Sequence, residues 1–306
     1  MKIFVDTAKI EEIKEAESWG ILDGVTTNPS LIKKAVESAG EGVSLEEYIK
    51  DILRTVDGPV SLEVISTTME GMITEAEVLY DKFNGINNNV VIKVPVNTSM
   101  EPGDDDFAGI KATKVLSEKG IPVNSTLIMT PNQALMAAKA GADYVSPFVG
   151  RIDDHIRNRI GLKGGVDYPK GTYYPEELAV RVWEKKLETA IHEQKIDDIV
   201  YRDHNIMRMF DWANDDGFFS GVDMLWSIKQ IYDRYGFDTE IIAASIRTDR
   251  QVRQCAEMGV DIATIPFPVI ENMMTHIKTS QGMKAFCDDV IPEYKAILWG
   301  KDFEKA

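Results

Sequence analysis

The stretch that decides the fold is Val90-Val91-Ile92-Lys93-Val94-Pro95-Val96, an aliphatic run that contains one lysine. A β-branched run of this length is typical of a strand buried on both faces of a parallel sheet. Burial removes water from the Lys93 ammonium and favours the neutral amine. A neutral amine can attack a carbonyl carbon and form a Schiff base. A lysine in a strand can also reach the surface or pair with a carboxylate, so Lys93 alone leaves both roles open.

Other apolar runs of strand length lie on both sides of this stretch, and helical patterns separate them. The expected strands are residues 2–6, 24–28, 60–64, 90–96, 122–128, 144–149, 240–246 and 261–267. The clearest helical patterns are residues 8–19, 46–56, 108–119 and 132–140. Buried strands that alternate with helices predict a parallel sheet, and eight repeats predict a closed (β/α)₈ TIM barrel. No Gly-x-Gly-x-x-Gly follows a strand, which disfavours a dinucleotide-binding fold.

Three threonines begin Thr-x-x-Glu/Gln patterns shortly after an expected strand. They are Thr67, Thr130 and Thr248. The pattern is typical of a helix N-terminus, where the threonine caps the helix and the third residue after it bonds back. We expect these threonines to be caps with no catalytic role.

One connection is far longer than the others. A strand–helix–strand unit takes about 30 residues, whereas residues 150–239 separate the sixth and seventh strands. Helical patterns occur there at residues 175–194, 197–213 and 222–235, and we expect the last to be the barrel's own helix. The sequence predicts a single barrel domain over residues 1–306. Its helical insertion, at about 155–235, would be a lid or an oligomer contact.

Composition disfavours several classes of partner. The chain has 50 acidic and 34 basic residues and a formal net charge of −16. Nucleic acid and anionic membranes need a basic surface, so we expect neither as a partner, and an anionic substrate needs a local cluster of arginines. No apolar run reaches the roughly 18 residues of a membrane span. Cys255 and Cys287 form no Cys-x-x-Cys pair, the histidines lack metal-ligand spacing, and no signal peptide is visible. We expect a reduced, cytoplasmic protein.

Polar side chains recur at the carboxyl ends of the expected strands, where the active sites of (β/α)₈ barrels lie. In chain order they are Asp6, Thr26, Asn28, Glu63, Lys93, Asn124, Thr126, Ser146, Arg151, Ser245 and Arg247. Some of these residue types have ordinary structural roles at such positions. An aspartate or asparagine can cap a helix or hold a loop, and Glu63 can pair with Lys93 inside the barrel. An amine, two carboxylates and two arginines at one mouth nevertheless predict an active site.

Six ordered motifs resemble the signatures of the transaldolase family. They are Asp6 after the first strand, Gly24-Val25-Thr26-Thr27-Asn28-Pro29-Ser30-Leu31, Ile92-Lys93-Val94-Pro95, Asn124-Ser125-Thr126-Leu127, Ser146-Pro147-Phe148-Val149-Gly150-Arg151-Ile152 and Ala244-Ser245-Ile246-Arg247. The resemblance covers about residues 1–151 and 239–290 and does not include the insertion. It implies a (β/α)₈ class I aldolase that needs neither a metal nor an organic cofactor.

The resemblance also implies roles for individual residues. Lys93 would form the Schiff base with a ketose, and Asp6 would take the proton of the C4 hydroxyl when the C3–C4 bond breaks. Glu63 and Thr126 would hold a water that carries protons during Schiff-base formation. The implied substrate-binding residues are Thr26, Asn28, Asn124, Ser146, Phe148, Arg151, Ser245 and Arg247. Among these, Arg151, Ser245 and Arg247 would bind a terminal phosphate.

The implied activity is the transfer of a dihydroxyacetone unit in the pentose phosphate pathway. The donor would be fructose 6-phosphate or sedoheptulose 7-phosphate, and the acceptor an aldose phosphate such as erythrose 4-phosphate. The related fructose-6-phosphate aldolases carry Gln and Lys where this chain has Glu63 and Arg247, which favours transfer. An aldolase acting on a ketose phosphate or a related sulfonated sugar is the alternative. A catalytically silent barrel that binds sugar phosphates is an alternative of another class. We expect a homo-oligomer whose other partners are small sugar phosphates.

Overall fold

The structure is a computed structural model that describes residues 1–39, 44–159, 162–169, 171–172, 188, 191–192 and 218–299. The chain divides into two compact units, Met1–Phe267 and Pro268–Ala306. The barrel lies wholly within the first unit. The second contains α15 (Ile277–Asp288) and α16 (Pro292–Trp299). No helix among the described residues is long and apolar enough to cross a membrane.

The first unit is built on a closed barrel of parallel strands in the order β1 to β8. The strands are β1 (Lys2–Asp6), β2 (Gly24–Thr26), β3 (Val60–Glu63), β4 (Val90–Pro95), β5 (Val123–Ile128), β6 (Tyr144–Pro147), β7 (Glu240–Ala243) and β8 (Ile262–Ile265). β1 pairs with both β2 and β8, which closes the ring. The predicted (β/α)₈ TIM barrel is therefore confirmed. All eight expected strands are present, and several end two or three residues earlier than the apolar runs.

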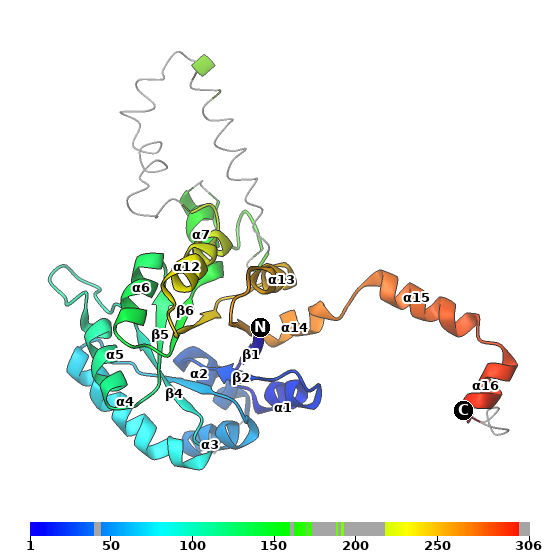
Figure 1. Ribbon diagram of the computed structural model, residues 1–306, viewed down its shortest axis with the longest axis horizontal. Helices are drawn as coiled ribbons and strands as arrows, with labels where there is room; N and C mark the ends of the chain where they lie inside the picture. The colour runs from blue at the N-terminus through cyan, green and yellow to red at the C-terminus, as the bar shows by residue number, and fades with distance from the viewer. Residues whose placement is uncertain are drawn as a thin grey trace. The chain divides into compact units, whose positions relative to one another are not determined.

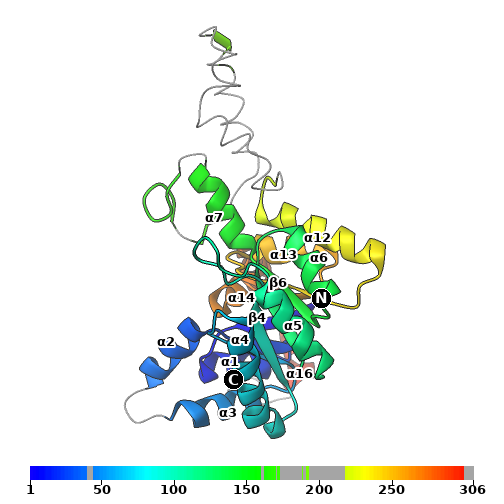
Figure 2. The same ribbon diagram turned by 90° about the vertical axis from the view of Figure 1, so that its left-hand side faces the viewer.

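Helices follow the strands and surround the barrel (Figures 1 and 2). They are α1 (Ile10–Ser18), α2 (Pro29–Ala39), α3 (Leu45–Thr55), α4 (Met69–Phe83), α5 (Ala108–Glu118), α6 (Pro131–Lys139), α7 (Val149–Arg159), α12 (Gly221–Tyr235) and α13 (Asp249–Met258), with a 3₁₀ turn at Asn84–Ile86. α14 (Phe267–Met273) begins at the last residue of the first unit. α12 lies beside α6, where the Tyr232 hydroxyl donates to the Ala134 carbonyl at 2.7 Å, so it is the barrel helix that the sequence predicts. The expected helices at 175–194 and 197–213 lie almost wholly outside the described residues. The single domain and the role of the insertion stay predictions.

The two faces of the strands have different partners. Outward-facing Leu62, Ile92 and Val94 belong to a core cluster that also includes helix residues such as Ile52 and Leu116. This is the layer between strands and helices that a (β/α)₈ fold requires.

Inside the barrel, an apolar layer lies below the carboxyl ends of the strands. Phe4, Ile242 and Ile262 are almost completely buried and pack together, with Tyr144 against them. A Cβ on Gly24 would stand 2.6 Å from the Phe4 ring, so the small residue at the start of β2 makes room for this layer. We name these four packed side chains the apolar plug. Residues two positions further along the same strands face the same way and lie at the mouth.

The predicted helix caps are confirmed at two of three sites. Thr130 and Thr248 form complete capping boxes with Gln133 and Gln251. The prediction for Thr67 is wrong, because Thr68 caps α4 by accepting from the backbone N–H of Gly71. The Glu75 carboxylate binds the backbone N–H groups of Ile65 and Ser66, and the helix begins only after the turn that these bonds hold.

Candidate active site

A polar cavity of about 170 Å³ opens at the mouth of the barrel. It is lined by Asp6, Thr26, Asn28, Lys93, Ser146, Phe148, Arg151, Ala244, Ser245 and Thr264. Asp6, Ser146, Ala244 and Thr264 each lie two residues beyond a member of the apolar plug, so strand alternation places them directly above it. Eight of the residues that the sequence selects therefore line one cavity.

Lys93 lies inside the barrel, as the sequence predicts. Strand register pairs it with Glu63 on β3 and with Asn124 on β5. Its side chain is 7% exposed, and Nζ lies 3.2 Å from Glu63 Oε2. The Phe148 ring lies 5.8 Å from Nζ. The amine thus forms an ion pair with Glu63 and lies near the Phe148 ring. The 3.2 Å separation allows direct proton transfer between Lys93 and Glu63.

Asp6 lies at the same mouth and is oriented by hydroxyl groups. The Thr26 hydroxyl donates to Asp6 Oδ1 at 3.0 Å and lies 2.5 Å from the Thr264 hydroxyl. Since Thr26 gives its single proton to Asp6, Thr264 donates in turn to Thr26. Burial raises the pKa of Asp6, against the lowering effect of the Lys93 charge and the Thr26 hydrogen bond. A raised pKa suits a general base, because proton transfer is most effective when the pKa lies near the working pH.

A second chain of hydrogen bonds fixes Asn124. The Ser146 hydroxyl donates to Asn124 Oδ1 at 2.7 Å, and Asn124 Nδ2 donates to Ser61 Oγ at 3.2 Å. Asn124 is completely buried and does not line the cavity, whereas Ser146 does. The amide of Asn124 therefore orients the Ser146 hydroxyl.

Thr126 does not line the cavity. It pairs with Pro95 in strand register and is completely buried. Its hydroxyl oxygen has no hydrogen-bond partner among the described residues. The next residue, Leu127, has φ 58°, and the pairing of β5 with β6 shifts register here. Such an irregularity re-aims a side chain, and a buried hydroxyl without a protein partner fits a site for ordered water.

Asn28 and Ser245 combine structural and site roles. Asn28 Oδ1 accepts from the backbone N–H of Leu31 in the first turn of α2, which is the loop role that the sequence allowed, yet the residue also lines the cavity. Ser245 has φ 59°, in the left-handed region that non-glycine residues rarely adopt. Its carbonyl accepts from the backbone N–H of Gly150 at 3.1 Å, which joins the end of β7 to the start of α7.

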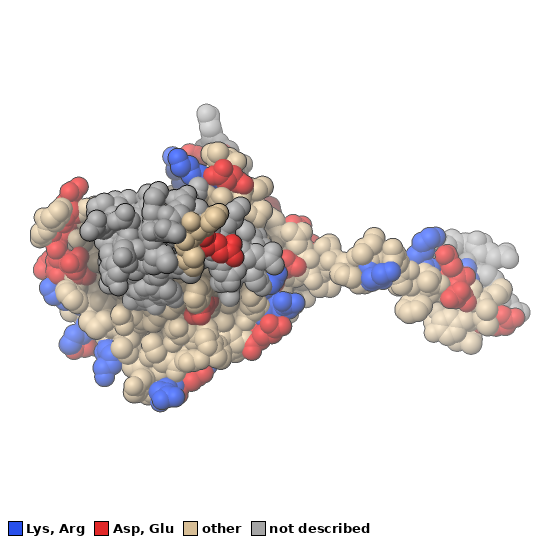
Figure 3. All heavy atoms as spheres, turned by 90° about the horizontal axis from the view of Figure 1, so that it is seen from above, with Lys and Arg blue, Asp and Glu red and all other residues tan. Residues whose placement is uncertain are grey.

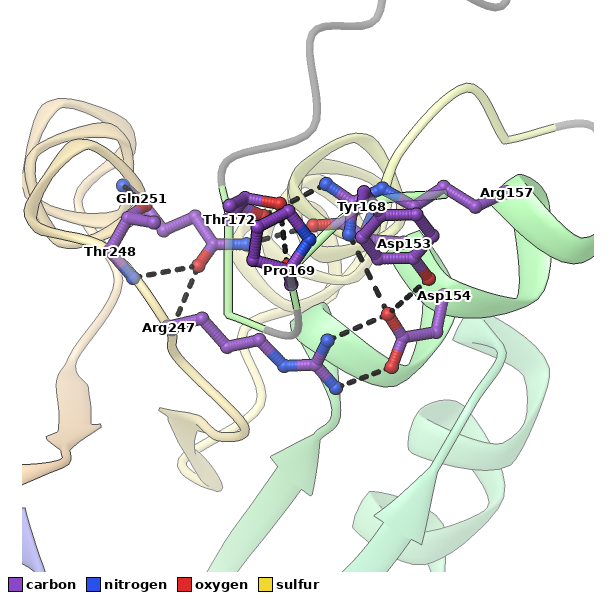
Figure 4. Close-up of polar contacts among 10 residues, drawn as sticks. Asp153, Asp154, Arg157, Tyr168, Pro169, Thr172, Arg247, Thr248 and Gln251 are labelled. Atoms are coloured by element: carbon purple, nitrogen blue, oxygen red, sulfur yellow. Dashed lines mark hydrogen bonds and ion pairs between the residues drawn. The ribbon is translucent and has the colours of Figure 1, made fainter. Parts of the chain in front are cut away.

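The two arginines are placed differently from each other. Arg151 lines the cavity, and its guanidinium lies 5.1 Å from the Phe148 ring. Arg247 is absent from the lining and is paired with Asp154 on α7 (Figure 4). Among the described residues on the face seen in Figure 3, basic side chains lie interspersed with acidic ones. Arg151 is the arginine that lines the cavity, together with the amine of Lys93.

Sequence reasoning missed three residues of this site. Two of them could have been found from the sequence. Ser61 lies two residues before Glu63 on β3 and so faces the same side of the strand, and Thr264 is the one polar residue in β8. Asp154 has no such signal. It meets Arg247 only because α7 lies beside the loop after β7, and that loop is 93 residues away in the sequence.

Beside the arginines, Asp153 is buried in a network of its own (Figure 4). It accepts from the backbone N–H of Gly221 and from Gln251 Nε2, both at 2.8 Å. Gln251 Oε1 in turn accepts from the backbone N–H of Arg247. Burial raises the pKa of Asp153 to about 6. Asp153 therefore links the starts of α12 and α13 to α7 around the arginine pair.

Asp153→Asn is expected to remove a pH-dependent cost to folding. Below about pH 4 both folded and unfolded states carry the Asp153 proton, and above about pH 6 neither does, so wild type loses stability as pH rises between these values. A shift from 3.8 to about 6 corresponds to on the order of 3 kcal/mol. Urea unfolding of both proteins from pH 4 to pH 7 measures the difference. The free energy of unfolding of the variant relative to wild type should rise by about 3 kcal/mol over this range. A difference that stays constant with pH would contradict the prediction.

Comparison with known proteins identifies relatives over nearly the whole chain. The family model described as "Transaldolase/Fructose-6-phosphate aldolase" matches residues 3–302, so the likeness includes the insertion that the sequence motifs left out. A "Probable transaldolase" of Coprothermobacter proteolyticus is 39% identical over 94% of this chain and 96% of its own length. Proteins of the same description from Desulfatibacillum aliphaticivorans and Agathobacter rectalis are 41% and 39% identical, and cover 94% and 97% of this chain and 97% and 99% of their own lengths.

Proposed function

The chain belongs to the transaldolase/fructose-6-phosphate aldolase family, and we propose that it transfers a dihydroxyacetone unit between sugar phosphates through a Schiff base on Lys93. The donor is a ketose phosphate such as fructose 6-phosphate or sedoheptulose 7-phosphate, and the acceptor is an aldose phosphate. The observation that carries the proposal is a buried amine at a barrel mouth, 3.2 Å from one carboxylate, with a second, partly buried carboxylate, that of Asp6, lining the same cavity.

The proposed reaction begins with attack of Lys93 Nζ on the C2 carbonyl of the ketose. Glu63 lies at hydrogen-bonding distance of Nζ and receives or returns protons as the carbinolamine loses water. A water between Glu63 and the lone hydroxyl of Thr126 extends this path. Removal of water leaves an iminium ion, which can accept the electron pair of the C3–C4 bond.

Asp6 then acts on the C4 hydroxyl. It takes the hydroxyl proton, the C3–C4 bond breaks, and an aldehyde leaves while the three-carbon fragment stays on Lys93 as an enamine. The reverse steps on a new aldehyde return the proton from Asp6 and form the new bond. Thr26 occupies Oδ1 of Asp6, which leaves Oδ2 for the substrate.

Trapping with borohydride tests the proposal. Borohydride reduces an iminium to a stable amine, so the protein incubated with fructose 6-phosphate should gain the mass of the reduced adduct on the peptide that contains Lys93. Steady-state rates with and without erythrose 4-phosphate separate transfer from the cleavage reaction of an aldolase. A label on another residue would overturn the proposed mechanism, and binding of sugar phosphate without any label would favour the silent barrel.

Glu63→Gln is expected to slow formation of the Schiff base by about 10²–10⁴-fold, because glutamine keeps the shape but cannot exchange a proton. The rate at which the borohydride label appears on Lys93 measures this step directly. Glu70→Gln is the matched control, since Glu70 is an exposed acid in the first turn of α4. An unchanged labelling rate in Glu63→Gln would exclude the proposed proton transfer.

A further inference from the structure

Arg247 is held by a carboxylate of the protein. Its Nη1 and Nη2 atoms donate to Asp154 Oδ1 and Oδ2 at 2.7 and 2.6 Å (Figure 4). Asp154 lies one turn after Arg151 on α7, and Arg247 lies on the loop between β7 and α13. Paired, two-bond contacts of this kind are the strong form of an arginine–carboxylate interaction. The guanidinium that the sequence assigns to a substrate anion is thus already paired with an anion of the protein.

Asp154 is itself fixed by the segment that follows α7. The Tyr168 hydroxyl donates to Asp154 Oδ1 at 3.0 Å. The Arg157 guanidinium lies 4.1 Å from the Tyr168 ring, and Arg157 Nη2 donates to the Thr172 carbonyl at 2.8 Å. The Arg157 guanidinium also lies 3.6 Å from Asp154 Oδ1. Against the raising effect of burial, the hydrogen bonds from Arg247 and Tyr168 and the charges of Arg247 and Arg157 hold the pKa of Asp154 below its ordinary value. Asp154 is therefore an ionised, well-positioned partner of Arg247.

The stem of Arg247 is restrained independently of this pair. A Cβ on Gly150 would stand 2.6 Å from Arg247 Nε and 3.0 Å from Cδ, so the stem lies directly across the first turn of α7. Gly150 precedes Arg151, which brings Arg247 next to the arginine that lines the cavity. Loss of Asp154 would free the end of Arg247 but leave its course across α7 in place.

We propose that Asp154 is a built-in counter-anion that competes with the substrate's anionic group for Arg247 and thereby sets the affinity of the anion subsite. The inference rests on the anion subsite of the proposed function. Arg151 and Arg247 bring two positive charges to this end of the cavity, and Asp154 cancels one of them. A phosphate that takes over Arg247 must break two charge-assisted hydrogen bonds to Asp154, and it then lies near a carboxylate of its own sign.

Asp154 affects phosphate binding in two ways, through its negative charge and through its hydrogen bonds that orient Arg247, and we expect the charge to have the larger effect on affinity. Two unit charges about 6 Å apart interact by roughly 0.7 kcal/mol in water and about 3 kcal/mol near a protein surface, which is about three- to a hundredfold in affinity. A five- to tenfold change lies in the lower part of this range, as a partly exposed pair requires. The orienting effect of Asp154 is reduced because contact with Gly150 already restrains the stem. Removal of the Asp154 charge should therefore tighten anion binding. Moderate affinity favours turnover in a transfer reaction, because a phosphorylated aldehyde has to leave before the next one binds.

Binding of inorganic phosphate to the full chain tests the inference without turnover. Isothermal titration calorimetry should show Asp154→Asn binding phosphate about five- to tenfold more tightly than wild type. Arg247→Ala should bind it more weakly, and the Asp154→Asn change should have no effect in the Arg247→Ala background. Asp249→Asn is the control, because it removes the same charge from an exposed position two residues from Arg247 and should change the dissociation constant less than twofold.

The KM values of phosphorylated and unphosphorylated donors supply a second measurement. Asp154→Asn should lower the KM for fructose 6-phosphate and leave the KM for fructose unchanged. Weaker or unchanged phosphate binding in Asp154→Asn would overturn the inference, as would a gain that persists without Arg247. If Asp154→Asn does not fold, Asp154→Ala serves instead, since it removes the same charge together with both acceptor oxygens and should also tighten phosphate binding. No tightening in that variant would count equally against the inference.

These measurements separate the inference from the proposed function. If Asp154→Asn binds phosphate more tightly through Arg247 but Lys93 takes no borohydride label, the proposed reaction is refuted and the role of Asp154 is supported. A label on Lys93 with no gain in Asp154→Asn would sink only the role of Asp154.

Discussion

Lys93→Ala should abolish both transfer activity and borohydride labelling with fructose 6-phosphate. Without the amine no iminium can form, and the C3–C4 bond has no acceptor for its electron pair. Loss of a nucleophile of this kind costs at least about 10⁴-fold in kcat. Rates of transfer to erythrose 4-phosphate and intact mass after borohydride treatment are the two measurements.

Folding has to be controlled in this variant, because Glu63 loses the partner of a largely buried ion pair. Breaking such a pair can cost about 3–5 kcal/mol of stability. Lys93→Met fills more of the volume and should be equally inactive while its circular dichroism stays close to wild type. Lys111→Ala removes an exposed lysine that pairs with Asp105 and should keep full labelling. Labelling of a folded Lys93→Ala protein would refute the assignment of the nucleophile.

Asp6→Asn should uncouple formation of the Schiff base from cleavage. The variant keeps the amine of Lys93 and the acid Glu63, so fructose 6-phosphate should still give a borohydride-stable adduct. Asparagine cannot take the C4 proton, and release of the aldehyde should fall by about 10²–10⁴-fold. The adduct should accordingly retain all six carbons of the ketose, whereas wild type should also give a three-carbon adduct.

The pH profile provides a further check on Asp6. Cleavage needs the ionised carboxylate, so its rate should fall as pH falls through the pKa of Asp6. Since burial raises this pKa, the fall should occur at a higher pH than for an ordinary aspartate. Single-turnover release of glyceraldehyde 3-phosphate at a series of pH values measures it. A variant that loses the adduct together with cleavage would show that Asp6 acts before the bond breaks.

The strands and the reacting groups could be predicted from the sequence because each depends on local pattern. β4 is recognisable as a run of aliphatic residues, and the burial of Lys93 follows from its place in that run. The capping boxes at Thr130 and Thr248 need only four consecutive residues. The cap at Thr67 was misplaced because side-chain bonds from Glu75 decide where α4 begins.

Contacts between distant elements could not be predicted in the same way. Nothing near Arg247 in the sequence indicates that its guanidinium meets Asp154, because α7 and the loop after β7 approach each other only when the ring of strands closes. The sequence also did not indicate which of the polar side chains inside the barrel line the cavity. Asn124 and Thr126 are completely buried and do not line the cavity, whereas Ser146 does, although all three lie on the neighbouring strands β5 and β6.

The apolar plug of Phe4, Tyr144, Ile242 and Ile262 has a stereochemical consequence. These side chains fill the barrel below Lys93, so a carbon fragment attached to the amine is shielded from beneath and open only toward the mouth. An incoming aldehyde can then approach just one prochiral face of that fragment. The fragment's carbon in each new bond should therefore take the same configuration, whichever aldehyde is offered.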